Sequence, residues 1–140
     1  MEYKIFLDTN ILLDFFDDKR INYKEAVSII EAAENDFVNC FVSESVLNTT
    51  IYVAIKALPK VVLVNMLQHL LSFIQILPAT NEVYNKAFVN AKNDIEDAVL
   101  YQIALNNKLD YFITNDLKDF RKIEAEALPV VQAKEFLKHI

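Results

Sequence analysis

Short runs of consecutive apolar residues alternate along this chain with longer stretches in which apolar residues recur every three or four positions. The short runs predict buried strands, and the longer stretches predict helices. The expected strands are residues 3–7, 37–42, 75–77, 110–113 and 129–131. The expected helices are residues 10–16, 23–34, 44–57, 59–76, 81–92, 95–106 and 132–139. This alternation predicts an α/β fold of three α/β/α layers, with a central, mostly parallel sheet of four to five strands.

Polar residues mark the expected ends of several helices. Ser43, Thr80 and Asp94 each stand just before a helical stretch, where their side chains can cap the first turn. The chain contains no glycine, so a helix end that needs a positive φ must use Asn or Asp. We expect such ends within "END" (34–36) and "NNK" (106–108).

The absence of glycine also excludes functions that depend on glycine-rich turns, namely a Walker P-loop, a dinucleotide-binding turn and a strained nucleophile elbow. With 140 residues, 54% of them hydrophobic, the chain is expected to form a single domain over 1–140. No apolar stretch is long enough for a membrane span, and the first residues lack the order of a signal peptide. The one cysteine, Cys40, suits a small buried side chain. We therefore expect a cytoplasmic protein without a membrane partner.

The helix expected at 59–76 is apolar on more than one side. Its main stripe consists of Leu63, Met66, Leu67, Leu70, Leu71 and Ile74. Further apolar residues widen this stripe: Val61, Val62, Val64 and Phe73. Deep burial and a dimer or partner surface are both consistent with this pattern. The helix at 44–57 carries further apolar residues, which favour a dimer or partner surface.

Three acidic positions are expected at one edge of the sheet. The strands 3–7 and 110–113 end in "FLDTN" and "FITND", which places Asp8 and Asp116 just past their ends. In parallel sheets, sites form at the carboxyl ends of the strands. A third segment, "NDIEDAV" (93–99), places Asp97 one helical turn after Asp94. For Asp94 alone a capping role is the simpler interpretation, whereas Asp97 stands beside residues that must pack inward.

Clustered carboxylates repel one another, and a divalent cation is the usual remedy. Oxygen ligands favour Mg²⁺ or Mn²⁺. A zinc site is not expected, because His69 and His139 stand alone and the chain has no Cys/His spacing. The formal net charge is −6, so a site acting on a phosphodiester needs a metal ion to neutralise it first.

The segments "FLDTNILLDFF", "DIEDAVLYQIAL" and "DYFITNDLKDF" resemble, in order and spacing, the three signature blocks of the PIN domain family. The resemblance covers essentially the whole chain, and the length of the chain matches that of the toxin ribonucleases of VapC type. By this resemblance Asp8, Asp97 and Asp116 hold Mg²⁺ or Mn²⁺ for RNA cleavage, and Asn10 and Thr114 orient those acids. The resemblance thus implies that the three acids are catalytic and metal-binding and that Asn10 and Thr114 only position them.

The sequence departs from the family pattern at one position. PIN domains usually carry another acid about two turns into the helix after the second strand, where this chain has Asn48 or Thr49. Glu44 is acidic but falls at the start of that helix, where a helix-dipole role is equally consistent. Either Glu44, as a catalytic acid, or Asp94, as a metal ligand, could supply the missing charge.

The expected function is therefore a metal-dependent endoribonuclease, the toxin of a type II toxin–antitoxin pair. Its expected partners are RNA, a second copy of the chain in a homodimer, and a cognate antitoxin. Lys118, Arg121 and Lys122 could contact RNA phosphates or form a solvated face. The alternative is a PIN-like protein-binding module with a weakened metal site. A phosphatase of the haloacid-dehalogenase type is disfavoured, because Asn10 stands where that chemistry needs an acid.

Overall fold

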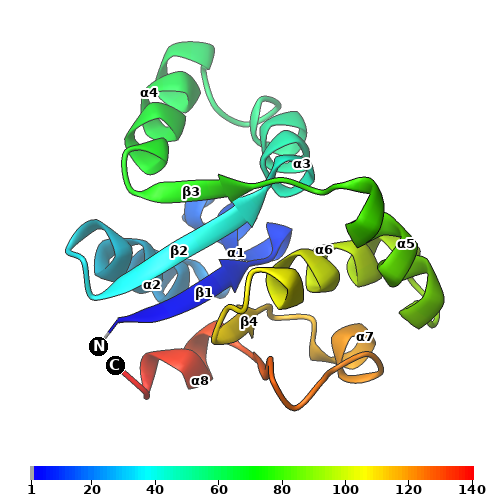
Figure 1. Ribbon diagram of the computed structural model, residues 1–140. Coiled ribbons are helices and arrows are strands. Elements are labelled where there is room, and N and C mark those ends of the chain that lie inside the picture. The colour runs from blue at the N-terminus through cyan, green and yellow to red at the C-terminus, as the bar shows by residue number, and fades with distance from the viewer. Residues whose placement is uncertain (1) are drawn as a thin grey trace.

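The computed structural model describes residues 2–140 and contains a five-stranded sheet in which every strand pair is parallel. The strand order is β3-β2-β1-β4-β5. The strands are β1 (Tyr3–Leu7), β2 (Val38–Ser43), β3 (Ile74–Leu77), β4 (Tyr111–Ile113) and β5 (Val130–Val131). Helices cover the sheet on both faces, so the predicted three-layer α/β/α architecture is confirmed (Figure 1).

In the described part of the chain, eight helices connect and cover these strands. They are α1 (Thr9–Phe16), α2 (Tyr23–Glu34), α3 (Glu44–Ala54), α4 (Lys60–Leu71), α5 (Asn81–Asn90), α6 (Ile95–Asn106), α7 (Leu117–Arg121) and α8 (Ala133–Leu137). Helix α1 packs against α2 and α3, while α6 packs against α5 and α7. Within residues 2–140, every helix is too short or too polar to cross a membrane.

The centre of the sheet is the most deeply buried part of the molecule. Strand β1 lies between β2 and β4, and Phe6 is paired in register with Phe112. Both rings are fully buried and stack with centroids 5.2 Å apart. Burying aromatic rings of this size contributes a large part of the hydrophobic stabilisation. The two strands that end at the expected site are thereby fixed next to each other.

The predicted helix starts are confirmed by capping hydrogen bonds. The side chains of Ser43, Thr80 and Asp94 each accept a hydrogen bond from the backbone N–H three residues later. The positive-φ prediction was right for "END", where Asp36 has a φ of 62°. It was wrong in residue type for "NNK", where Lys108 has the positive φ of 54°.

Several predicted boundaries need correction. Helix α3 ends at Ala54 rather than near Ala57, and α4 ends at Leu71 rather than at residue 76. Ile74, which the helical spacing placed on the stripe, belongs to β3 and is buried in the sheet. The segment "DLKDF", expected as a turn, forms most of the short helix α7. These errors arise because apolar spacing alone does not distinguish the last turn of a helix from the first residue of a strand.

Much of the apolar surplus on α4 faces solvent. Leu63 and Leu70 are buried, whereas Val61 is 70% exposed and Val62 and Val64 are also exposed. On α3, three large apolar side chains are exposed as well: Tyr52, Val53 and, just after the helix, Ile55. Deep burial therefore does not explain the width of the apolar stripe.

Candidate metal centre

Asp8 lies at the carboxyl end of β1, where the chain enters α1. It is the N-cap of α1, and its Oδ1 accepts a hydrogen bond of 2.7 Å from the backbone N–H of Thr9. Its Oδ2 accepts one of 2.8 Å from the Thr114 hydroxyl and one of 3.1 Å from Asn10 Nδ2. The residue is only 6% exposed. Three donors therefore fix the orientation of a buried carboxylate.

Thr114 joins the two strand ends into one structure. Besides donating to Asp8, its Oγ1 accepts hydrogen bonds of 3.0 Å from Asn10 Nδ2 and from the backbone N–H of Asp116. The backbone N–H of Asn115 donates to Asn10 Oδ1 at 3.0 Å. The segment that carries Asp116 is thus held against the start of α1, and the side chains of Asn10 and Thr114 link the two.

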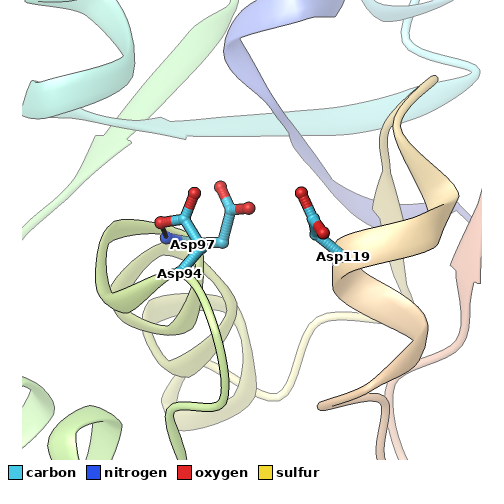
Figure 2. A group of neighbouring side chains, drawn as sticks. All are labelled: Asp94, Asp97 and Asp119. Atoms are coloured by element: carbon cyan, nitrogen blue, oxygen red, sulfur yellow. Dashed lines mark hydrogen bonds between the residues drawn. The ribbon is translucent and has the colours of Figure 1, made fainter.

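The third expected acid, Asp97, lies in the first turn of α6. Asp94 caps this helix, and its Oδ1 accepts a hydrogen bond of 3.0 Å from the backbone N–H of Asp97. One carboxylate oxygen each from Asp94, Asp97 and Asp119 lies within 4.8 Å of the other two. Figure 2 shows Asp94 and Asp97 on α6 facing Asp119 on α7. Asp94 therefore caps the helix and also belongs to an acidic cluster.

Asp119 is the member of this cluster that the sequence analysis missed. It stands three residues after Asp116, a spacing that returns to the same side when the segment is helical. The neighbouring Phe120 is fully buried, with its ring centroid 4.5 Å from that of Phe112. The segment "DLKDF" was expected to form a turn, so the spacing did not predict that Asp119 lies on the same side as Asp116.

The electrostatics show that the acids act on one another. Burial raises the pKa of Asp97 to about 7, with further contributions from the charges of Asp94, Asp8 and Asp116. Burial also raises the pKa of Asp8, against the lowering effect of hydrogen bonds from Thr114 and Thr9. The negative charges of Asp116 and Glu96 add to this rise in the pKa of Asp8. The acids from β1, α6 and the β4–α7 segment therefore share one electrostatic environment.

A second polar network supports the same edge and was not expected from the sequence. Asp14, on α1, is buried and accepts a hydrogen bond of 3.0 Å from Asn115 Nδ2. Its other carboxylate oxygen forms a 2.6 Å ion pair with Nε of Arg20. Because Asn115 lies next to Asp116, this network also helps to fix the loop between β4 and α7.

The sequence matches the family model described as the PIN domain over residues 4–118. The match spans most of the chain. This chain belongs to the PIN domain family.

Individual relatives of this PIN domain agree with that assignment. It is 28% identical over 133 residues to Ribonuclease VapC1 of Aquifex aeolicus, covering 89% of each chain. Its fold is similar to a toxin–antitoxin complex from Klebsiella pneumoniae, with a TM-score of 0.66 and 22% identity over 89% of this chain and 94% of that one. It is also similar to VapBC2 of Rickettsia felis bound to a promoter DNA fragment, with a TM-score of 0.66 and 19% identity over 92% and 98% of the two chains.

Glu44 is placed differently from the other acids of this PIN domain. It is exposed in the first turn of α3 and lines a hollow of about 230 Å³ together with Ser45, Asn48 and Tyr84. The three-carboxylate cluster of Asp94, Asp97 and Asp119 does not include it. Its predicted contribution to catalysis stays a prediction, and Asp119 is a further candidate for the missing acid.

The basic residues that follow Asp116 are all exposed. Arg121 is engaged with Glu124, whose carboxylate oxygen lies 2.9 Å from Nη1 of Arg121. Lys118 and Lys122 lie on either side of it along α7 and its end. The two interpretations of these residues, phosphate contacts and a solvated face, both remain compatible with this arrangement.

Proposed function

We propose that this PIN domain is a metal-dependent endoribonuclease and the toxin of a type II toxin–antitoxin pair. The observation that carries this proposal is the acidic cluster at the carboxyl edge of the sheet. Three carboxylates approach within 4.8 Å there, and Asp8 and Asp116 share their electrostatic field. The name of the relative Ribonuclease VapC1 supports RNA as the substrate.

The donor set suits Mg²⁺ or Mn²⁺. Every group in the cluster offers carboxylate oxygen. Burial and, after it, the neighbouring negative charges raise the pKa of Asp97, and a cation there would favour the charged form of this group. Asp8, Asp97 and Asp116 would hold the ion, with Asp94, Asp119 or Glu44 completing its shell. Of the first three, only Asp97 belongs to the three-carboxylate cluster, so this ligand set is part of the proposal. When bound, such an ion supplies positive charge that activates a water molecule and stabilises the pentacoordinate phosphate.

The chain's own residues hold this arrangement in place. The donors from Thr9, Asn10 and Thr114 keep the Asp8 carboxylate in one orientation. Buried and fixed acids cost no reorganisation when the substrate arrives. With a net charge of −6, the chain offers no general attraction for RNA, so substrate binding depends on the neutralised site and on local contacts.

We also propose a homodimer and an antitoxin as partners. The exposed apolar residues of α3 and α4, Val61 among them, would form an apolar helical interface between two copies. A separate hollow of about 450 Å³, lined by Phe15, Phe16, Leu58 and Met66, would accept an apolar helix of the antitoxin. The toxin–antitoxin complex among the structural relatives supports the second partner.

A protein-binding module with an inactive site is the second candidate function. It is favoured by the exposed apolar residues on α3 and α4 together with the exposed position of Glu44 outside the three-carboxylate cluster. The two candidate functions differ in whether the protein cleaves RNA when a divalent ion is added. A pure binding module leaves RNA intact whatever metal is added.

The test is an RNA cleavage assay on purified protein with a structured cellular RNA. We expect cleavage in Mn²⁺ or Mg²⁺, its loss in EDTA, and its return when the metal is restored. Asp97→Asn should abolish cleavage, whereas Glu31→Gln, an exposed acid on α2 away from the site, should leave it unchanged. Cleavage that survives both EDTA and Asp97→Asn would refute the proposal.

A further inference from the structure

An open cavity of about 420 Å³ lies beside the first turn of α6, outside the acidic cluster. It is formed by three elements that meet at the carboxyl edge of the sheet, the start of α3, the middle of α5 and the start of α6. Its lining residues are Ser45, Tyr84, Phe88, Ile95, Glu96 and Val99. Figure 1 shows α5 and α6 side by side at this edge of the molecule.

Two aromatic rings from α5 dominate the wall of this cavity. Tyr84 and Phe88 are one helical turn apart, and their ring centroids lie 6.0 Å from each other at an interplanar angle of 59°. Tyr84 is 42% exposed and Phe88 is 56% exposed. Rings that serve only the core are buried here, as Phe112 and Phe120 are. Exposed faces of this kind are the platforms on which proteins stack unpaired bases.

The cavity adjoins the acidic cluster directly. Ile95 and Glu96, which line it, stand between Asp94 and Asp97 in the first turn of α6. The cavity and the cluster therefore flank the same helix start, so neighbouring parts of one ligand can reach both.

We propose that this cavity binds a nucleobase of single-stranded RNA adjacent to the scissile phosphate, with the base stacked on Phe88 and Tyr84. The inference rests on the proposed ribonuclease function and adds the group that the substrate presents beside the metal centre. The cavity volume is ample for one base.

The chemistry of the lining favours a base over a phosphate. Among the residues that line the cavity there is no lysine, arginine or histidine, and the one charged side chain is the carboxylate of Glu96. This carboxylate repels phosphate oxygens but accepts hydrogen bonds from base N–H groups. Guanine carries two adjacent N–H donors, on N1 and N2, which match the two oxygens of a carboxylate. Glu96 therefore selects guanine over uracil at this position.

A fluorescence titration reads stacking directly. The chain contains no tryptophan, so Phe88→Trp introduces a single reporter in the cavity while keeping an aromatic ring there. The matched control is Phe37→Trp, at an exposed phenylalanine that does not line the cavity. The probe is a guanine-containing RNA hexamer in Ca²⁺, with its intactness checked on a gel. We expect the hexamer to quench the reporter at position 88 and to leave the control unchanged.

Two results of this titration would overturn the proposal. One is an unquenched reporter at position 88 while the protein still binds the hexamer. The other is a reporter at position 88 whose emission changes with protein concentration in the absence of RNA. The second result would make the cavity a contact between two copies of the chain.

Cleavage kinetics give the second arm. Phe88→Ala should raise KM about tenfold or more, because base stacking on one aromatic side chain commonly contributes that much. Its Mn²⁺ affinity should not change. Val89→Ala is the control, because Val89 is 84% exposed on the same helix and outside the cavity. Glu96→Gln should reduce the preference for guanine over uracil, and an unchanged preference would remove Glu96 as the base-reading residue.

The two proposals fail in different ways. If the parent cleaves RNA and Phe88→Ala keeps the parental KM, the ribonuclease proposal stands and the base-cavity proposal is refuted. If the protein neither binds Mn²⁺ nor cleaves RNA, yet the RNA hexamer quenches the reporter at position 88, the ribonuclease proposal is refuted and the base-cavity proposal stands. If there is neither cleavage nor quenching, both proposals are refuted.

Discussion

The hydroxyl of Thr114 donates a hydrogen bond of 2.8 Å to Oδ2 of Asp8, which is 106 positions earlier in the sequence. This contact exists because β1 and β4 are hydrogen-bonded neighbours, with Leu7 paired to Ile113 immediately before the two polar residues. Each strand ends its apolar run at the same height in the sheet. The similar segments "FLDTN" and "FITND" therefore meet at one edge.

Replacing Thr114 by valine should weaken both the fold and the metal centre. The buried hydroxyl donates to Asp8 and accepts from Asn10 and Asp116, so its loss removes three hydrogen bonds and leaves the backbone N–H of Asp116 without this acceptor. We expect the free energy of unfolding to fall by about 1–3 kcal/mol, measured by urea denaturation. Thr114→Ser keeps the hydroxyl and is the control. A valine variant as stable as the serine variant would contradict the hydrogen-bond account.

The pKa of Asp97 predicts how stability depends on pH in EDTA. Burial and the neighbouring acids raise this pKa from 3.8 to about 7 in the folded protein. Between these pH values the folded state binds the proton more tightly than the unfolded state, so the free energy of unfolding falls as pH rises. Asp97→Asn removes this effect. The free energy of unfolding of the variant should exceed that of the parent by roughly 1 kcal/mol at about pH 8, after allowance for solvent screening of the Asp97 charge.

Thermal unfolding of the parent and Asp97→Asn across this pH range measures the effect. The advantage of the variant should shrink toward about pH 4, where the parental carboxyl is protonated as well. Added Mn²⁺ should reverse the order by stabilising only the parent. A variant less stable than the parent at high pH in EDTA would show that the acids do not repel one another.

Tyr101 gives a prediction about the fold alone. It is buried on α6, where its hydroxyl donates to the carbonyl of Leu128 at 2.6 Å and accepts from the backbone N–H of Ala125 at 2.7 Å. Tyr101→Phe leaves both backbone groups without this partner, and we expect a loss of about 1–3 kcal/mol in the free energy of unfolding. Mn²⁺ affinity should be retained, because the bonds secure residues 125–128 and not the acids.

The proposed homodimer is tested on the exposed apolar residues of α4. Val61→Lys places a charge on a residue that is 70% exposed, so the monomer should fold normally while an apolar interface would be disrupted. We expect light scattering to show a dimer for the parent at micromolar concentration and a monomer for this variant. Val89→Lys, at a residue that is 84% exposed on α5, should stay dimeric. A parent that is monomeric, or a dimer indifferent to Val61→Lys, would exclude this interface.

The parts of this structure that could be predicted from the sequence depend on local patterns. Apolar runs located β1 and β4, and single polar residues such as Ser43 located helix starts. The placement of Asp8 and Asp116 at one edge followed from the rule that parallel strands end together. Other features depend on contacts between distant segments. Asp14 lies on a helix like any surface acid, and only the fold brings Asn115 and Arg20 to it.

Asp119 shows a different limit of sequence reasoning. Five residues are too few for apolar periodicity to distinguish a turn from a short helix, and the position of Asp119 depends on that distinction. The positive φ of Lys108 is a similar case. The backbone N–H of Leu109 donates to the carbonyl of Ala104 across this helix end, and the positive φ falls one residue beyond the two asparagines that favour it.

The central claim is that the acids at the carboxyl edge of the sheet form one divalent-cation site. Isothermal titration of the purified protein with Mn²⁺ tests it most directly, with Asp8→Asn, Asp119→Asn and Glu31→Gln measured alongside the parent. We predict saturable binding by the parent and by Glu31→Gln, loss of binding in Asp8→Asn, and at least tenfold weaker binding in Asp119→Asn. Mn²⁺ affinity that is the same in Asp8→Asn as in the parent would contradict the account.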